Sequence, residues 1–249
     1  MLFGSTQGNG DETLVLLHGF GGSHEQWQPL AELAEHMQML AYDLPGHGRS
    51  LDFPHAGPAK VAARAVLDDL DARRLEEVHL AGHSMGGAVA CLIATAAPER
   101  VKSLTLLAPG GFGEEINAPL LRRYAMAKSP QEIRTCLRAM SGPGVEPADQ
   151  TVAALAKMRA IAGQTEMLAR IVAAITANGR QGVIPKDRLS ALAMPVSVEW
   201  GPRDPVLPFS QALDLPPQFE LIVADGAGHM LVEERPSLLA TVIRKTVGR

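Results

Sequence analysis

The feature that most constrains the fold is the stretch VHLAGHSMGGAVACLIA, residues 78–94. A short apolar run ends at Ala81, the next five residues match the pattern G-x-S-x-G, and a run of small apolar residues follows. This pattern predicts a strand, a sharp turn with Ser84 at its tip, and a helix. Glycine is expected on both sides of the serine because a Cβ there would collide with neighbouring backbone. The sequence therefore predicts a unit that lifts one hydroxyl above the end of a sheet.

Further apolar runs have the length of short strands. They are continuous rather than alternating, which suits strands covered on both faces. Helix-length segments lie between them, and a last helix is predicted to begin at Pro236. This alternation predicts an α/β fold with one open, doubly wound and mostly parallel sheet. The predicted strands are residues 14–17, 39–42, 78–81, 103–107, 196–200 and 219–223.

One interval, residues 113–184, breaks the alternation. It contains helical patterns but no convincing strand, and a structureless loop of that length would be improbable. We expect a helical cap inserted above the carboxyl edge of the sheet. The alternative is a set of extra helices packed on the flank of the sheet. The predicted domains are thus a core of residues 1–112 and 185–249, and a cap of residues 113–184.

Composition and charge limit the kinds of partner that we expect the chain to bind. The chain has 249 residues and a formal net charge of −4, which gives no general attraction to nucleic acid or anionic membranes. Its N-terminus lacks a leader pattern, and no apolar run approaches the roughly 18 residues that span a bilayer. Cys91 and Cys136 lie far apart, which disfavours a disulfide framework or a cysteine metal site. We expect a soluble, cytoplasmic protein with a small-molecule substrate and neither cofactor nor metal; self-association stays open.

The loop GAGHM supplies a candidate base for the serine. It contains His229 and follows the last predicted strand, so it should open at the same sheet edge as Ser84. His83 flanks the serine but should point away from it, and His47 lies in a Gly-rich turn that it plausibly only stabilises. The remaining histidines are predicted to abut the first glycines, at His18, or to be surface or packing residues, at His24, His36, His55 and His79.

A catalytic histidine also needs a carboxylate that orients it and stabilises the imidazolium. Asp204 lies in WGPRD, directly after the penultimate predicted strand, and gives the chain order Ser, Asp, His. Asp225 is a rival, but its place four residues before His229 is more typical of a turn. Glu114 or Glu115 is a weaker candidate.

These segments together carry a resemblance. HGF, DLPGHGRS, GHSMGG, WGPRD and GAGHM occur in this order, and they closely resemble the α/β-hydrolase superfamily with a helical cap over nearly the whole chain. The resemblance implies the α/β-hydrolase fold and cofactor-independent catalysis. It also implies that Ser84 is the nucleophile, His229 the general base and Asp204 the orienting acid.

The first Gly-rich loop, residues 18–22, has two possible uses. A dinucleotide fingerprint would need glycine at position 24, where His24 stands, and the chain has no Walker A pattern. In the superfamily, this loop supplies half of an oxyanion hole. The resemblance therefore implies that the backbone N–H groups of Phe20 and Met85 bind the oxyanion.

Two groups of relatives resemble the segments LLAPGGFGEEINAPLL and LAKMRAIAGQ. One is the meta-cleavage product hydrolases, which cut a carbon-carbon bond in vinylogous diketo acids. The other is the hydrolase-like C-terminal domain of acetoin dehydrogenase acyltransferase components, for which we expect no room here for an upstream lipoyl domain. The first group usually has asparagine, arginine and tryptophan where this chain has His83, Lys157 and Met230. We treat these three as candidate substrate-binding residues, although Lys157 is also typical of a solvated helix.

Three functions follow from this sequence. The leading hypothesis is a serine hydrolase, of the esterase type, for a small ester, thioester or related acyl compound. The second keeps the same triad for carbon-carbon hydrolysis of a diketo acid. The third is a non-catalytic small-molecule receptor, which a complete triad disfavours. Haloalkane dehalogenation is disfavoured because that branch has aspartate where Ser84 stands.

Overall fold

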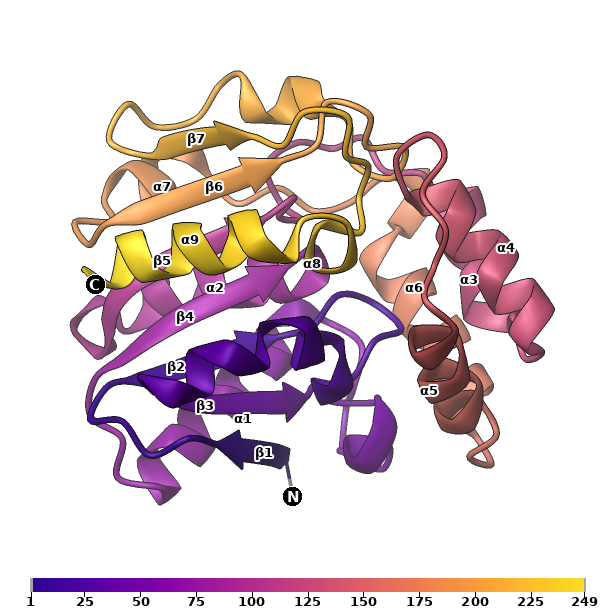
Figure 1. Ribbon diagram of the computed structural model, residues 1–249, viewed down its shortest axis with the longest axis horizontal. Coiled ribbons are helices and arrows are strands. Elements are labelled where there is room, and N and C mark those ends of the chain that lie inside the picture. Colours follow the sequence, from indigo (N-terminus) through magenta and orange to yellow (C-terminus); the bar gives the residue numbers. More distant parts are fainter. Residues whose placement is uncertain (1, 249) are drawn as a thin grey trace.

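The computed structural model describes residues 2–248 and places seven strands in one sheet (Figure 1). Their order is β1-β3-β2-β4-β5-β6-β7. Only β1 runs antiparallel to its neighbour, so the predicted mostly parallel α/β sheet is confirmed. The strands are β1 (Phe3–Gln7), β2 (Thr13–Leu17), β3 (Gln38–Asp43), β4 (Val78–His83), β5 (Val101–Leu107), β6 (Val196–Trp200) and β7 (Glu220–Val223).

Strand β1 was absent from the sequence prediction. Its sequence, FGSTQ, has no apolar run, and its residues are half-buried or exposed. An edge strand with one neighbour, here β3, needs less apolar cover than the central strands. In contrast, every residue of β2 and β4 is buried.

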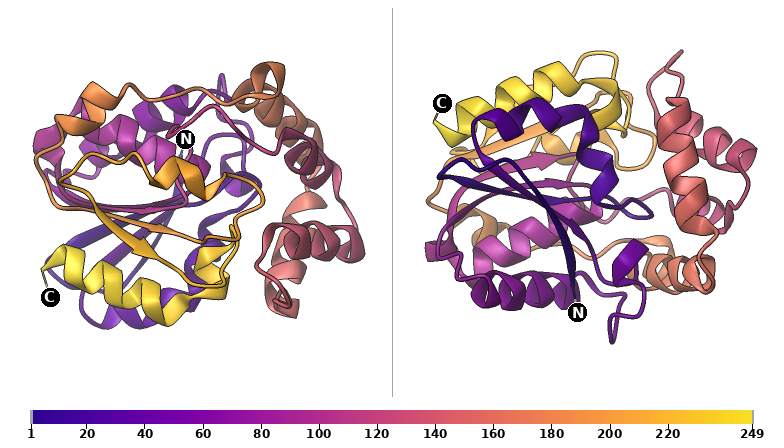
Figure 2. Two further views of the ribbon diagram at one scale, coloured as in Figure 1. Left: turned by 90° about the horizontal axis from the view of Figure 1, so that it is seen from above. Right: turned by 60° about the horizontal axis from the view of Figure 1, so that its bottom comes forward.

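Helices cover both faces of the sheet, as Figure 2 shows. On one face α1 packs against α2, and on the other α9 packs against η1. This arrangement buries the sheet on both sides and explains the continuous apolar runs. The elements of the sheet domain are η1 (His24–Glu35), α1 (Ala59–Ala72), α2 (Met85–Ala96), α7 (Lys186–Ser190), α8 (Leu231–Glu234) and α9 (Pro236–Val247).

Residues 113–184, the predicted cap, contain the helices α3 to α6, which lie beyond the arrowheads of the parallel strands (Figure 1); we call this segment the helical layer. In this layer α3 packs on α6 and α4 on α5. Within residues 2–248, none of the helices is long and apolar enough to cross a membrane. The helices of the layer are α3 (Ala118–Met126), α4 (Pro130–Met140), α5 (Asp149–Arg159) and α6 (Gln164–Ile175).

Candidate active site

Ser84 occupies a strained turn between β4 and α2. Its φ of 53° and ψ of −115° lie in a region that non-glycine residues rarely adopt, at a cost of about 1–3 kcal/mol. Hydrogen bonds fix the turn, because the N–H of Ser84 donates to the Leu107 carbonyl over 2.9 Å. The Ser84 carbonyl accepts from the N–H groups of Gly110 and Ala88 at 2.9 and 3.1 Å. The hydroxyl is therefore held at the carboxyl edge of the sheet.

The two glycines of G-x-S-x-G allow close backbone approach around this turn. A Cβ at Gly82 would lie 2.4 Å from the Gly86 carbonyl oxygen, and one at Gly86 would lie 2.0 Å from that of Leu17. Both distances are far below van der Waals contact. The pattern is therefore required by the packing of β2, β4 and the start of α2.

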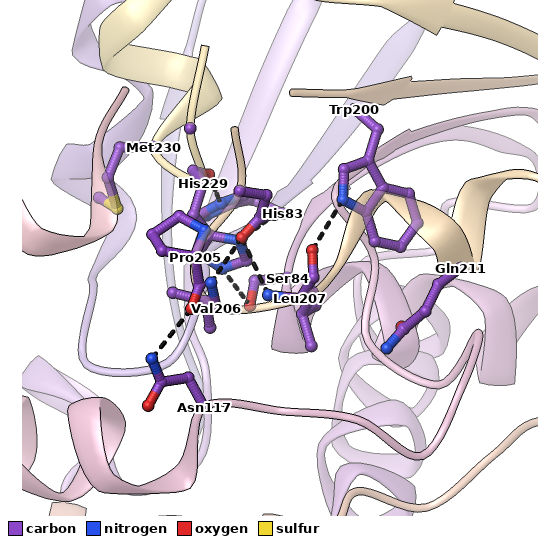
Figure 3. Close-up of polar contacts among 12 residues, drawn as sticks. His83, Ser84, Asn117, Trp200, Pro205, Val206, Leu207, Gln211, His229 and Met230 are labelled. Carbon is purple, nitrogen blue, oxygen red and sulfur yellow. Dashed lines mark hydrogen bonds and ion pairs between the residues drawn. The ribbon is translucent and has the colours of Figure 1, made fainter. Parts of the chain in front are cut away.

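His229 and Asp204 complete a hydrogen-bonded chain with Ser84. Figure 3 labels Ser84 and His229 of this chain. Nε2 of His229 lies 2.9 Å from the Ser84 hydroxyl oxygen, and Nδ1 lies 2.7 Å from Oδ2 of Asp204. Oδ1 of Asp204 accepts from the backbone N–H groups of Val206 and Leu207 at 2.8 and 2.9 Å. A carboxylate with these partners accepts the Nδ1 proton and leaves Nε2 free to accept from the serine.

The rival carboxylates lie elsewhere. Asp225 and Glu115 are exposed, and Glu114 forms an exposed ion pair with Arg180. Asp204, in contrast, has no exposed side-chain surface. The structure thus brings only Asp204 of these candidates into contact with His229 among the residues it describes.

His83 lies beside His229 rather than beside the Ser84 hydroxyl. Its Nε2 donates to the His229 carbonyl over 2.8 Å, and its Nδ1 lies 3.0 Å from Nε2 of Gln26. The Gln26 amide is oriented by Gly19, whose N–H donates to Oε1 at 3.0 Å, so Gln26 donates to His83. Burial lowers the pKa of His83 to about 3. The ring is therefore neutral and positions the backbone of His229.

The loop that contains Phe20 is held from both sides. The N–H of Gly21 donates to Nε2 of His47 over 3.1 Å, and burial lowers the pKa of His47 to about 3, which keeps this nitrogen an acceptor. The Gly21 carbonyl accepts from Nη1 of Arg159 at 3.1 Å and from the Tyr124 hydroxyl at 3.4 Å. These contacts fix the peptide next to Phe20.

Arg159 was not among the residues selected from the sequence. It lies on α5, is 3% exposed, and places its guanidinium 4.6 Å from the centre of the Tyr124 ring. Lys157, the cap residue selected instead, lies on the exposed side of the same helix. Arginine on a weakly patterned helix is usually solvated, so the sequence carried no signal for its burial.

Two cavities adjoin Ser84. The first, of about 340 Å³, is bordered by Gln26, His83, Met230 and Glu233, and we call it the polar compartment. The second has about 300 Å³ and is mostly aliphatic; we call it the apolar compartment. Lys157 borders neither cavity, whereas Phe20, Ser84 and Leu121 border both. Apolar-compartment residues include Met85, Leu92, Ile116, Ile175, Ile184 and Leu207.

The residues that the structure describes form no candidate metal site. No group of three or more His, Cys, Asp or Glu side chains within residues 2–248 is arranged to hold a metal ion. Cys91 and Cys136 are both buried free thiols.

Comparison with known proteins assigns the chain to a family. The model of the alpha/beta hydrolase family matches residues 14–242. The chain belongs to this family. Two relatives are dihydrolipoyllysine-residue acetyltransferase components of acetoin-cleaving systems. The one from Cupriavidus necator is 33% identical over 97% of this chain and 65% of its own length. The one from Pseudomonas putida is 36% identical over 91% of this chain and 61% of its own length.

The chain therefore spans just under two-thirds of those relatives. A 2-hydroxy-6-oxononadienedioate/2-hydroxy-6-oxononatrienedioate hydrolase from Cupriavidus pinatubonensis is 28% identical over 89% of this chain and 82% of its own length. Both groups of relatives named from the sequence are thus confirmed as relatives.

Solved structures agree on the fold. A meta-cleavage product hydrolase from Pseudomonas fluorescens superposes with a TM-score of 0.86 at 19% identity, over 98% of this chain and 93% of the other. An esterase from Rhodococcus sp. has a TM-score of 0.79 at 28% identity, over 99% and 94%. The first likeness concerns the fold alone.

Proposed function

We propose that this protein is a cofactor-independent serine hydrolase that acts on a small ester, thioester or related acyl compound. The observation that carries the proposal is the continuous chain from Asp204 through His229 to the Ser84 hydroxyl. Such a chain activates a hydroxyl that is otherwise a weak nucleophile.

The reaction would proceed in two halves. Ser84 attacks the substrate carbonyl while Nε2 of His229 takes the hydroxyl proton, and the N–H groups of Phe20 and Met85 bind the oxyanion. His229 then gives its proton to the leaving group, which departs and leaves an acyl-serine. Water, deprotonated by His229, attacks this ester. His229 then returns the proton to the Ser84 oxygen as the acid is released, which restores the free Ser84 hydroxyl. Asp204 orients His229 and stabilises the imidazolium.

The two compartments support a substrate with two arms. Because both adjoin Ser84, the acyl group and the leaving group can extend in different directions from the reacting carbonyl. The small volumes favour compact arms, since ligand pockets commonly measure about 300–1,000 Å³. The acetyltransferase relatives are a reason to include acetyl thioesters in a substrate panel.

The proposal is tested by the hydrolysis of p-nitrophenyl acetate. The parent should release p-nitrophenol, and Ser84→Ala, shown by circular dichroism to be folded, should reduce the rate to background. An equally active Ser84→Ala variant would overturn the proposal.

A second candidate is carbon-carbon hydrolysis of a vinylogous diketo acid. It is favoured by the relative from Cupriavidus pinatubonensis, whose name states that class of substrate. The test is the bleaching of a yellow dienolate, with the rate compared between the parent and Ser84→Ala. Steady absorbance across a panel of such compounds would exclude this activity.

A further inference from the structure

The described side chains that border the polar compartment include carboxyl groups but no lysine or arginine. This differs from what an acidic substrate would need, such as the one in the name of the Cupriavidus pinatubonensis relative. The compartment has two glutamates and several amides on its border. Its mouth is bridged by an amide pair, in which Gln150 donates to Gln28 over 2.9 Å. A ligand in this compartment therefore meets acceptors and neutral dipoles but no cationic side chain.

Glu233 is the unsatisfied member of this border. It lies on α8, four residues after His229. Within residues 2–248, its Oε2 is buried without a hydrogen-bond partner. Oε1 has a long contact of 3.5 Å to Nε2 of Gln26, and the carboxyl group also interacts with its own backbone N–H. The Gln26 amide already donates to His83 at 3.0 Å. A buried carboxyl oxygen left without a partner costs stability, so Glu233 has unused capacity to accept a hydrogen bond at the border of the cavity.

The adjacent Glu234, in contrast, has hydrogen bonds typical of a structural role. Its carboxylate accepts from three backbone N–H groups, those of Gly142 at 3.0 Å, Gly228 at 2.9 Å and Met230 at 3.0 Å. Glu234 therefore ties α8 to the loops around the base. Glu233 has no comparable contacts, although it is next to Glu234 in the sequence and borders the cavity.

We propose that Glu233 makes the polar compartment the binding site for a substrate arm that carries a hydrogen-bond donor, either a hydroxyl or an ammonium group, and that the compartment rejects a carboxylate. This inference rests on the proposed function, because the arm must continue to a carbonyl at Ser84. A carboxylate bound there would lose its hydration water and would lie near Glu25 and Glu233. No lysine or arginine on the described border could pair with it.

The protonation of Glu233 is compatible with both kinds of donor. Burial raises the pKa of Glu233 to about 8. Near neutral pH the carboxyl group is then mostly neutral and can accept from a hydroxyl, while an ammonium ion would favour its ionised form. The other titratable groups around this part of the border are Glu25, His83, Tyr124, His229 and Glu234.

The apolar compartment differs in this respect, because its border includes the exposed Lys60. A carboxylate arm that binds there would be insensitive to Glu233. The experiment must therefore present the variable group from either side of the reacting carbonyl.

The test uses p-nitrophenyl or alkyl esters of equal length that end in a methyl, hydroxymethyl, ammonium or carboxylate group. One series carries this group on the acyl side and a second on the alcohol side, and kcat/KM is measured at one fixed pH. In at least one series the parent should prefer the ammonium to the carboxylate by about tenfold or more, which is the scale of one charged contact.

Glu233→Gln keeps the shape of the side chain and removes its ability to ionise beside an ammonium group. It should reduce that preference to within about threefold, whereas Glu99→Gln, the same change at an exposed position outside the cleft, should leave it unaltered. Glu233→Lys should invert the preference toward the carboxylate. Thermal unfolding identifies any variant that fails to fold.

Two results would overturn the inference: a parent that prefers the carboxylate in both series, or a preference that Glu233→Gln leaves unchanged. Either could occur in an active serine hydrolase. If the parent hydrolyses none of the esters and Ser84 resists acylation, the proposed function itself fails.

Discussion

The carboxyl edge of the sheet and the helical layer of residues 113–184 contribute to the site in different ways. The sheet edge supplies Ser84, Asp204 and His229, and backbone hydrogen bonds fix the first two in place. The helical layer supplies walls of the cleft, such as Leu121 and Leu155. Backbone geometry thus holds the side chains proposed to react, while the shape of the cavities depends on side chains of the helical layer.

The helical layer is nevertheless tied to each loop of the sheet edge. Asn117 donates from its backbone to the Val206 carbonyl over 2.9 Å and from its side chain to Pro205 over 3.0 Å (Figure 3). The N–H of His229 donates to the Met140 carbonyl over 2.8 Å, and Arg159 contacts Gly21. The loops that contain Asp204, His229 and Gly21 thus each contact the helical layer.

The largest effect is expected at the sheet edge, from Asp204→Asn. The amide would donate toward Nδ1 of His229, so the proton would move to Nε2, which then cannot accept from Ser84. We expect kcat for an ester to fall by about 10⁴. The matched control is Asp225→Asn, an exposed change that should leave kcat within about twofold. A loss below tenfold in Asp204→Asn would show that the carboxylate does not orient the base.

A smaller effect is expected from the helical layer, in Arg159→Met. The Gly21 carbonyl would lose its charged donor, and the neighbouring Phe20 N–H would be less well aligned with the oxyanion. We expect kcat to fall by about 10- to 100-fold with a smaller change in KM, and Arg159→Lys to restore part of the loss.

Lys157→Met is the control on the same helix. Its exposed side chain borders neither compartment, so kcat and KM for a neutral ester should be unchanged. A rise in KM for carboxylate substrates would instead support the substrate-binding role considered from the sequence. An unaltered Arg159→Met enzyme would show that the helical layer does not affect the oxyanion loop.

The sheet edge should also be the acid-sensitive region. His47 has a pKa of about 3 in the folded protein because it is buried, and about 6.5 when unfolded. Between these values the unfolded chain binds more protons, so the free energy of unfolding falls as pH falls through this window. From pH 6.5 to 5.5 this histidine accounts for about 1 kcal/mol.

The measurement is urea unfolding of the parent and His47→Gln across this range. The variant should show a shallower decline of the free energy of unfolding with acid than the parent. Parallel curves for the parent and His47→Gln would contradict a neutral, buried His47.

The smallest effect is expected in the apolar compartment. Ile184→Ala would lengthen this space, because the Ile184 side chain forms part of its border. We expect the ratio of kcat/KM for butyrate to that for acetate esters to rise about three- to tenfold, as one or two methylenes are worth that much. Leu213→Ala, at a position that is 71% exposed, is the control. An unchanged ratio would show that acyl groups bind in the polar compartment instead.

The difference between the sheet edge and the helical layer also explains which features could be predicted from the sequence. The sheet was predictable because buried parallel strands are continuous apolar runs, and the loops after them occur in a fixed order. Ser84, Asp204 and His229 were found from those loops, and the structure joins them by hydrogen bonds, although their catalytic roles stay predictions. Of the seven strands described, only β1 was not predicted, because its polar sequence has no strand pattern.

The contribution of the helical layer had no local signal. Arg159 and Lys157 are similar cations two residues apart, and only tertiary packing decides which one is buried. Glu233 and Glu234 are adjacent and identical in type, yet one is held by three backbone N–H groups and the other borders the cavity. Such differences depend on contacts between residues far apart in the sequence, which periodicity does not report.

The central claim is that the Asp204–His229–Ser84 chain activates Ser84. The most direct measurement is the intact mass of the parent, Ser84→Ala and His229→Ala after exposure to a fluorophosphonate, followed by peptide mapping. The account predicts one adduct on the parent, located at Ser84, and none on either variant. A folded parent that stays unmodified, or an adduct that persists in Ser84→Ala, would contradict it and favour a non-catalytic receptor or another nucleophile.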